Sequence, residues 1–199
     1  MVNILHISDF HLNVDIEKSK FRLNKLCEAI KENKINIDII VFTGDVIDSR
    51  KIKNESIDQF KLLHKDKFSS SYEKFEDEIL KFDDNILKEF TDLIIKNTNY
   101  AFNVASKVFQ NFCNILRVDV NNIILCCGNH DRLRIIGEEK SCMIEDASSK
   151  DVYFQCFDNF CKSLPLKYTY ETCLYESEGY TFLINNSNWD LTNKNDVCF

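Results

Sequence analysis

The stretch IDIIVFTGD, residues Ile37–Asp45, decides how this chain folds. Its apolar run predicts a buried strand that ends in an aspartate. Residues Val2–Ser8 form a similar run with β-branched residues, which predicts a strand buried on both faces of a helix-covered parallel sheet. Between the two, Phe21–Asn33 has apolar residues at helical spacing. Strand, helix and strand in this order predict a βαβ unit that gathers ligands at the carboxyl ends of its strands.

Further strands follow downstream. Residues Asn121–Asp131 predict a third buried strand, which ends in Asn-His-Asp. Residues Tyr168–Glu176 and Tyr180–Asn188 flank a turn at Glu178–Gly179 and predict a final pair of strands. We expect the three parallel strands and this pair to form one sheet with helices packed on it, in an α/β fold.

Helical periodicity dominates the middle of the chain. It covers residues 55–117, with expected breaks near Ser69–Ser71 and Asn97–Asn99. This stretch is longer than one crossover helix needs, so we expect a helical insertion. Two alternatives stay open for it: a cap beside the site, or a packing layer without contact to substrate. Val152–Leu164 predicts another short helix, which Pro165 stops.

The composition bounds the class of protein. A chain of 199 residues that is 44% apolar and 12% aromatic is long enough to bury one core, so we expect one domain. Four glycines and one proline predict long elements rather than many turns, in a helix-rich α/β chain. The net charge of −7 argues against a broad basic face for nucleic acid, although a local patch is still able to hold a phosphate.

The cysteines and the N-terminus bear on location. Nine cysteines make an odd count without a Cys-x-x-Cys motif, which predicts reduced and mostly buried thiols. The N-terminus lacks the basic region of a signal peptide, and no apolar run approaches about 18 residues. We expect a soluble, cytoplasmic protein that does not bind a membrane.

Three predicted strands end in residues of the types that bind metal ions. Asp9 and His11 follow the first strand, Asp45 ends the second, and Gly-Asn-His-Asp at 128–131 follows the third. Residues two apart in an extended chain point to the same side, so Asp9 and His11 are able to bind one ion together. Carboxylate, imidazole and amide oxygen suit Mn²⁺, Fe or Zn²⁺. For Asp9 and His11 alone, a helix cap and a surface histidine are the alternative.

The same residues lie in three recognisable blocks. The blocks are DFH (9–11), GDVID (44–48) and GNHD (128–131), each at a predicted strand end. In this order they resemble the calcineurin-like metallophosphoesterases, over Val2 to about Asp131. The stretch LINNSNW, residues 183–189, is also similar to the strand that the family places after its third block. The resemblance implies a dinuclear hydrolase with a four-layer αββα sandwich.

The resemblance also implies a role for each matching residue. The metal ligands would be Asp9 and His11 for a first ion, Asp45 as a bridge, and Asn129 for a second ion and the phosphate. His130 would protonate the leaving oxygen or stabilise the transition state. Asp131 would orient His130, and Asp48 would align a ligand. For Asp48 and Asp131, surface capping is the alternative.

The chain also departs from the family pattern. The family has a further histidine and a Gly-His-x-His block downstream of its LINNSNW-like strand, and none of the four histidines here follows position 130. Either the sequence is the first part of a longer protein, or it is a natural remnant with a weakened site. We favour the first, because a remnant has less reason to keep ligand-type residues at three strand ends. The expected domain therefore covers residues 1–199, is C-terminally truncated and leaves an apolar face or strand edge exposed.

Two functions compete at this point. The first is a phosphodiesterase or nuclease that uses two divalent ions (Mn, Fe or Zn) to hydrolyse a nucleotide or nucleic acid, because HISDFHL, residues 6–12, resembles the exonuclease and cyclic-nucleotide branches. It would act together with further domains of the same chain. Arg132 and Arg134 are candidates to contact a substrate phosphate, with solvated surface arginines as the favoured alternative. The second is an inactive scaffold that binds a protein partner through residues 55–117.

Overall fold

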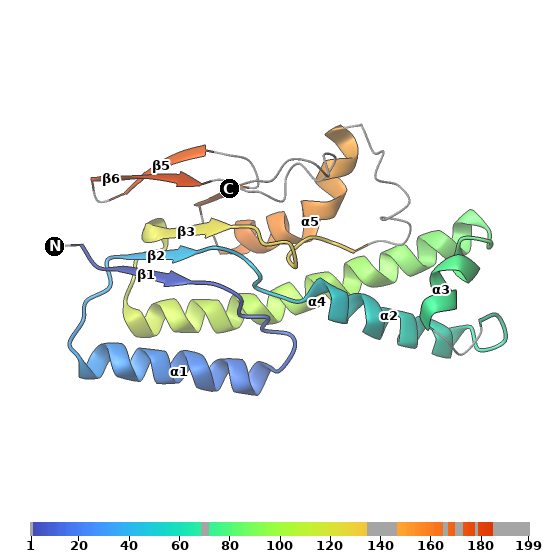
Figure 1. Cartoon of the computed structure of the whole chain (residues 1–199), viewed down its shortest axis with the longest axis horizontal. Coiled ribbons are helices and arrows are strands. Elements are labelled where there is room, and N and C mark those ends of the chain that lie inside the picture. The colour runs from blue at the N-terminus through green and yellow to red at the C-terminus, as the bar shows by residue number, and fades with distance from the viewer. Residues whose placement is uncertain are drawn as a thin grey trace.

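The structure is a computed structural model that describes residues 2–68, 72–134, 147–164, 167–169, 173–177 and 179–184. Its main sheet is parallel and has the order β1-β2-β3-β4, and a separate antiparallel hairpin is formed by β5 and β6 (Figure 1). The strands are β1 (Ile4–Ile7), β2 (Ile39–Phe42), β3 (Ile123–Cys126), β4 (Lys167–Thr169), β5 (Cys173–Ser177) and β6 (Tyr180–Ile184). The helices are α1 (Ile16–Glu32), α2 (Ser49–Leu63), α3 (Tyr72–Ile79), α4 (Asp84–Leu116) and α5 (Ala147–Ser163), with a 3₁₀ turn η1 at Val120–Asn122.

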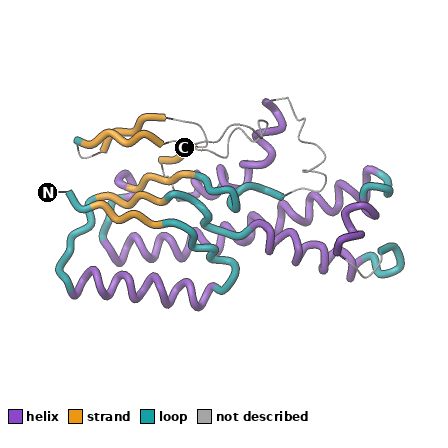
Figure 2. Tube along the Cα trace, viewed as in Figure 1, coloured by secondary structure: helices purple, strands orange, loops and turns teal. Residues whose placement is uncertain are grey.

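The strand order explains why the helices share one face of the sheet. Each new strand adds to the same edge, and right-handed crossovers in one direction place their helices on one side. Figures 1 and 2 show α1 and α4 along that side. Helix α5 packs on α4, where Phe160 stacks on Phe102 with ring centroids 5.1 Å apart. One large core of buried residues joins these helices to the sheet.

The hairpin β5–β6 covers part of the opposite face. Tyr175 and Phe182 pack there against Ile39 and Ile124, which are buried in β2 and β3. The outward side chain of Leu174 is paired with Leu183, and these are 70% and 68% exposed. Among the described residues, the hairpin thus exposes two neighbouring leucines on its outer face.

The prediction that the final strand pair joins the main sheet is wrong. The stretch expected as one strand at Tyr168–Glu176 contains β4, which continues the parallel sheet, and β5, which pairs antiparallel with β6. β4 follows a helical crossover and so adds to the sheet in parallel, whereas β5 and β6 are joined by a tight turn that imposes antiparallel pairing. Residues 185–188, the expected end of the last strand, lie outside the described residues.

Strand β1 also differs from its prediction as a strand buried on both faces. It is an edge strand, paired with β2 alone in the described sheet. Ile4 is 45% exposed and His6 is exposed, while Ile7 is buried. One neighbour and one covered face leave only part of the strand away from water.

The helix boundaries differ from the prediction: α2 begins at Ser49 and α5 at Ala147, each a few residues earlier than expected, and α1 and α4 show the physical reasons. Helix α1 begins at Ile16 rather than Phe21, because the Asp15 side chain caps it by accepting the N–H of Lys18. Helix α4 runs without interruption through the break expected at Asn97–Asn99. A polar residue there does not end the helix, because the Asn97 amide donates a hydrogen bond to Ser56 Oγ in α2 at 2.9 Å and so joins the two helices. The other expected break, Ser69–Ser71, is outside the described residues.

Helices α2, α3 and α4 occupy the chain between β2 and β3, where the helical insertion was expected over residues 55–117. They extend beyond the end of the sheet (Figure 1). Within the described part of the chain, no helix has both the length and the apolar character needed to cross a membrane.

The buried thiols carry a first prediction. Cys113 and Cys156 are buried, and burial raises the pKa of these thiols to about 12 and about 11. At pH 8 both stay protonated, so we expect N-ethylmaleimide to modify them only after unfolding. Mass spectrometry of peptides labelled with and without denaturant measures this, with the half-buried Cys126 as an internal comparison. Labelling of Cys113 in the folded chain at the rate seen in denaturant would contradict the prediction.

Candidate metal centre

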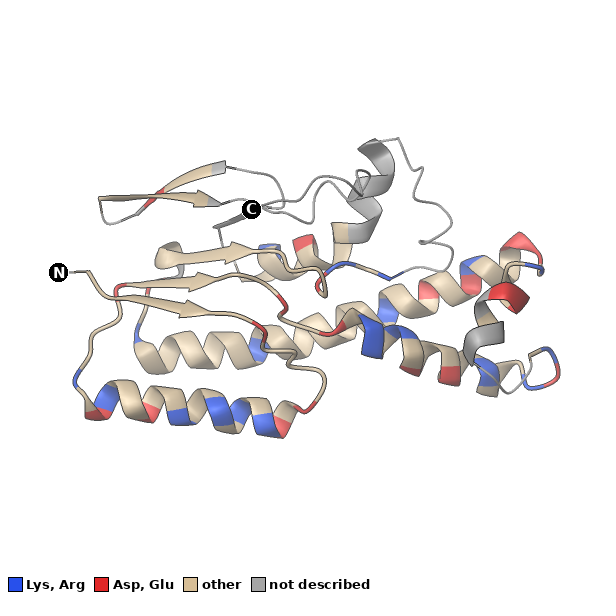
Figure 3. Cartoon of the chain, viewed as in Figure 1, with Lys and Arg blue, Asp and Glu red and all other residues tan. Residues whose placement is uncertain are grey.

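The site is built where the loops after β1 and β2 run side by side. The backbone N–H of Asp9 donates to the carbonyl oxygen of Gly44 at 3.2 Å, and that of His11 donates to the carbonyl of Asp45 at 2.9 Å. The parallel pairing of the strands thus continues past their ends. It brings the DFH and GDVID blocks into contact, and Figure 3 shows acidic positions where these strands leave the sheet.

Three of these residues have an unusual backbone conformation. Asp9, His11 and Asp45 have φ angles of 58°, 45° and 58°, in the left-handed region that residues other than glycine rarely adopt. Such a conformation costs about 1–3 kcal/mol per residue and is concentrated at functional sites. The local pairing described above holds these loops in place.

The three side chains form one donor group. One ligand atom from each of Asp9, His11 and Asp45 lies within 4.8 Å of the others. His11 Nε2 is 4.0 Å from Asp45 Oδ2, and the Ser8 hydroxyl donates to the Asp9 carboxylate. Two carboxylates and an imidazole at this spacing fit a divalent ion of the Mn²⁺, Fe or Zn²⁺ type.

The loop after β3 contacts this donor group through Asp45. The backbone N–H of His130 donates to Asp45 Oδ1 at 2.9 Å. This is possible because Gly44 and Gly128 touch, and a Cβ atom on either would come closer than 3.0 Å to the other loop. Asn129, the fourth predicted ligand, lies in this loop with an exposed side chain, so its role stays a prediction.

Asp131 holds the loops together from a fully buried position. Its carboxylate accepts the N–H of Ile47 at 3.1 Å and the N–H of Gly128 at 2.9 Å. Burial raises the pKa of Asp131 to about 7, even though both N–H donors lower it. The described contacts place this carboxylate on backbone groups, not on the His130 ring that we expected it to orient.

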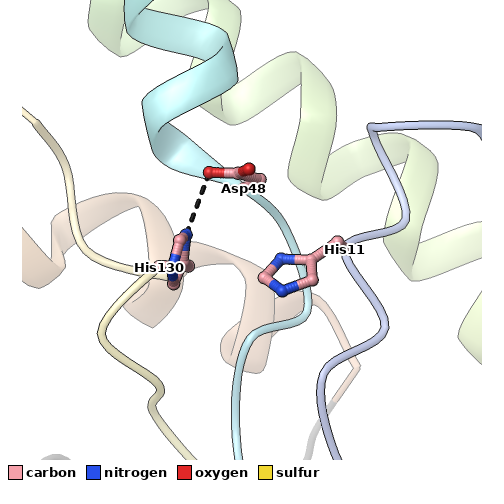
Figure 4. A group of neighbouring side chains, drawn as sticks. All are labelled: His11, Asp48 and His130. Atoms are coloured by element: carbon pink, nitrogen blue, oxygen red, sulfur yellow. Dashed lines mark hydrogen bonds and ion pairs between the residues drawn. The ribbon is translucent and has the colours of Figure 1, made fainter.

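The carboxylate beside the His130 ring is Asp48. Its Oδ1 lies 2.9 Å from His130 Nδ1, as the dashed line in Figure 4 marks, and His130 is 7% exposed. Burial acts to raise the pKa of Asp48, but the hydrogen bond with His130 and a backbone N–H of α2 outweigh it and hold that pKa below its usual value. Asp48 also caps α2. Asp48 therefore caps α2 and also contacts the His130 ring, and its expected role in aligning a ligand stays a prediction.

Sequence reasoning missed Arg50, which also lies at the site. Its Nη2 is 2.9 Å from His130 Nε2, and its Nε is 3.7 Å from Asp48 Oδ1. The signal was its place in the first turn of a helix directly after the GDVID block. Of the two arginines that we considered instead, Arg134 donates to the carbonyl oxygen of Asn129, the neighbour of His130, at 3.4 Å.

A second group of possible metal ligands shares His11. One ligand atom each of His11, Asp48 and His130 also lies within 4.8 Å of the others, and Figure 4 shows the three side chains around a common space. The edge of one histidine ring faces the other, with centroids 4.9 Å apart. However, the guanidinium of Arg50 already supplies a positive charge to this group and repels a metal ion. The group of Asp9, His11 and Asp45 is therefore the better candidate.

The fold and site together define an α/β domain with a candidate metal centre at the carboxyl edge of a parallel sheet. The family model of the calcineurin-like phosphoesterases matches residues 2–196, and the chain belongs to this family. The predicted family and its α/β fold are thus confirmed. Members are hydrolases that act on phosphate esters with divalent metal ions. Comparisons with curated proteins and with solved structures gave no match.

Proposed function

We propose that this chain is a metal-dependent phosphodiesterase domain that acts on a nucleotide or nucleic acid. The observation that carries the proposal is the convergence of Asp9, His11 and Asp45 within 4.8 Å beside the pair formed by Asp48 and His130. An anionic donor group next to an oriented imidazole is what hydrolysis of a phosphate ester needs. The similarity of residues 6–12 to the exonuclease and cyclic-nucleotide branches favours a diester.

The residues divide the work as follows. Asp9, His11 and Asp45 would hold a divalent ion, and Asp45 and Asn129 would contribute to a second one, with Mn, Fe or Zn as the proposed ions. A divalent ion there supplies a Lewis acid for a phosphoryl oxygen and lowers the pKa of a water molecule. Asp48 fixes the imidazole of His130, which is then placed to protonate the leaving oxygen. Asp131 keeps the three loops in register through Ile47 and Gly128.

His130→Ala is the direct test of the acid. We expect turnover of bis-p-nitrophenyl phosphate with Mn²⁺ to fall about 10²–10⁴-fold, the usual contribution of general acid catalysis. Metal content should stay nearly the same, because the hydrogen bonds of the His130 ring go to Asp48 and Arg50, and the ring meets the donor group of Asp9, His11 and Asp45 only through the edge of the His11 ring. The paired measurement is the rate and the bound metal of the wild type and of His130→Ala.

Two results would contradict the proposal. Full activity of His130→Ala would show that His130 is not the general acid. No hydrolysis by the wild type with any divalent ion would favour the scaffold alternative, in which a protein partner binds the helices between β2 and β3. Leu62 and Leu63, at the end of α2, are 65% and 64% exposed and would be part of such a surface.

A further inference from the structure

We propose that a hollow between α1 and α4 is a binding site for a nucleoside monophosphate. The hollow has a volume of about 250 Å³ and is lined by apolar and polar side chains from both helices. Sites for small molecules are concave, mostly apolar and equipped with a few polar groups that orient the ligand. None of the described residues that line the hollow belongs to the candidate metal centre, so the proposal does not depend on the proposed hydrolysis.

The floor of the hollow is apolar and belongs to the core. It consists of Leu23 from α1 and of Val108 and Phe112 from α4, which are 4%, 9% and 2% exposed. All three are part of the large core that joins the helices to the sheet, so their positions are fixed by packing. In a closely packed helix pair, the side chains of one helix fill the grooves of the other. Here an apolar surface stays open between the helices, which suits the flat face of a ligand ring.

The rim of the hollow is polar and has the same pattern on both helices. Lys20 and Asn24 are four residues apart on α1, and Lys107 and Asn111 are four residues apart on α4. Residues at this spacing lie on one face of a helix, about 6 Å apart along its axis. Both helices lead into a strand of the parallel sheet and therefore run in the same direction (Figure 1). The two lysines thus lie at one end of the hollow and the two amides at the other.

The lysine end of the hollow suits a phosphate. The chain has a net charge of −7, yet the charged residues among the described lining of the hollow are both lysines. Figure 3 shows basic positions on both helices where α1 and α4 lie side by side. Lys20 Nζ donates to Glu17 Oε1 at 2.8 Å, but the two side chains are 45% and 79% exposed, and such surface pairs contribute little. A phosphate between two ammonium groups forms stronger, charge-assisted hydrogen bonds.

The amide end of the hollow favours a nucleobase over an aliphatic chain. An asparagine amide has donors and an acceptor, and it pairs with N6 and N7 of adenine through two hydrogen bonds. An alkyl carboxylate or alkyl phosphate would cover both amides without offering them a partner, which is costly. A nucleoside monophosphate has its base and its phosphate at opposite ends of one ribose. This arrangement matches amides and lysines that are separated by one helical turn.

The first experiment measures AMP binding by calorimetry in EDTA, so that no divalent ion reaches the candidate metal centre. We expect a Kd between about 10 μM and 1 mM, because the ligand is small and the hollow is open on one side. Lys107→Ala should weaken binding about 10–100-fold, the range for losing a hydrogen bond to a charged group. Lys96→Ala is the matched control, because it removes an exposed lysine of α4 that does not line the hollow. It should bind AMP as the wild type does.

The second experiment separates the two ends of the ligand. Ribose 5-phosphate lacks the base, adenosine lacks the phosphate, and octanoate has an alkyl chain in place of the nucleoside. Each should bind at least about 10-fold more weakly than AMP, because each leaves one end of the hollow without its partner. Asn111→Ala should weaken the binding of AMP but not that of ribose 5-phosphate. In ¹³C spectra, the ring of the bound base should shift the methyl signals of Leu23 and Val108.

Several results would overturn the proposal. They are no AMP binding by the wild type, equal AMP affinity in Lys107→Ala and Lys96→Ala, and AMP binding that leaves the methyl signals of Leu23 and Val108 unchanged. Ribose 5-phosphate or adenosine that binds as tightly as AMP would show that one end of the hollow takes no part. Octanoate that binds more tightly than AMP would assign the hollow to aliphatic anions. All of these measurements are made without metal, so they are independent of whether the chain hydrolyses phosphate esters.

Discussion

Replacing Asp45 by asparagine should abolish both metal binding and hydrolysis while leaving the fold intact. Asparagine has the same shape, and its amide oxygen still accepts the His130 N–H that Asp45 Oδ1 accepts at 2.9 Å. What it removes is the negative charge beside His11, on a side chain only 14% exposed. Residues that merely support a metal ligand contribute about 10–100-fold to affinity, so a direct ligand should contribute more.

The measurement pairs calorimetry of Mn²⁺ binding with the rate on bis-p-nitrophenyl phosphate. Asp38→Asn is a suitable control, because this carboxylate caps the turn before β2 through Asn3 and Asn36, away from the loops of the site. We expect the control to bind Mn²⁺ as the wild type does. Unchanged metal affinity in Asp45→Asn would mean that the ion, if bound, lies elsewhere.

Gly44→Ala should have the largest effect on stability. Gly44 has a φ of +103°, and a Cβ atom there would come closer than 3.0 Å to the backbone of Gly128. Neither backbone is able to move freely, because Asp131 binds one loop through Gly128 and the other through Ile47. Strain and overlap together should lower the free energy of unfolding by at least about 3 kcal/mol.

Gly179→Ala separates the two causes. This glycine also has a positive φ, +77°, but a Cβ atom on it would meet nothing within 4 Å in the part of the chain that the structure describes. Left-handed strain alone should therefore cost about 1–2 kcal/mol. Urea denaturation of both variants gives the comparison. Equal losses would show that the close approach of Gly44 to Gly128 contributes nothing beyond strain.

Local patterns were sufficient to locate β1, β2 and β3 and the point where the loops that follow them meet. Strands β2 and β3 lie where the apolar runs before Asp45 and Asn129 predicted them. A short apolar run that ends in a turn usually forms a buried strand. The pairing of the DFH and GDVID blocks then followed from parallel neighbours. The helix break at Asn97–Asn99 failed for the opposite reason: Asn97 is satisfied by Ser56 of another helix, which no local pattern records.

The partners of the acidic residues were also beyond local reasoning. Asp48 and Asp131 each follow a strand by a few residues, and either is able to reach His130 on spacing alone. Burial decides which carboxylate reaches the His130 ring. The fully buried Asp131 accepts backbone N–H groups that would otherwise have no partner, whereas Asp48 faces the ring. Arg50 was missed because its contact spans α2 and the loop after β3, which lie far apart in the chain.

The strand order has a consequence for biogenesis. Because β1, β2, β3 and β4 are added to one edge in chain order, the sheet is able to grow as the polypeptide leaves the ribosome, N-terminal part first. Asp9, His11 and Asp45 come together once β2 is available, whereas His130 must wait until all of α2, α3 and α4 have been made and β3 closes that long loop. A nascent chain thus brings Asp9, His11 and Asp45 together well before Asn129 and the proposed acid, His130, have been made.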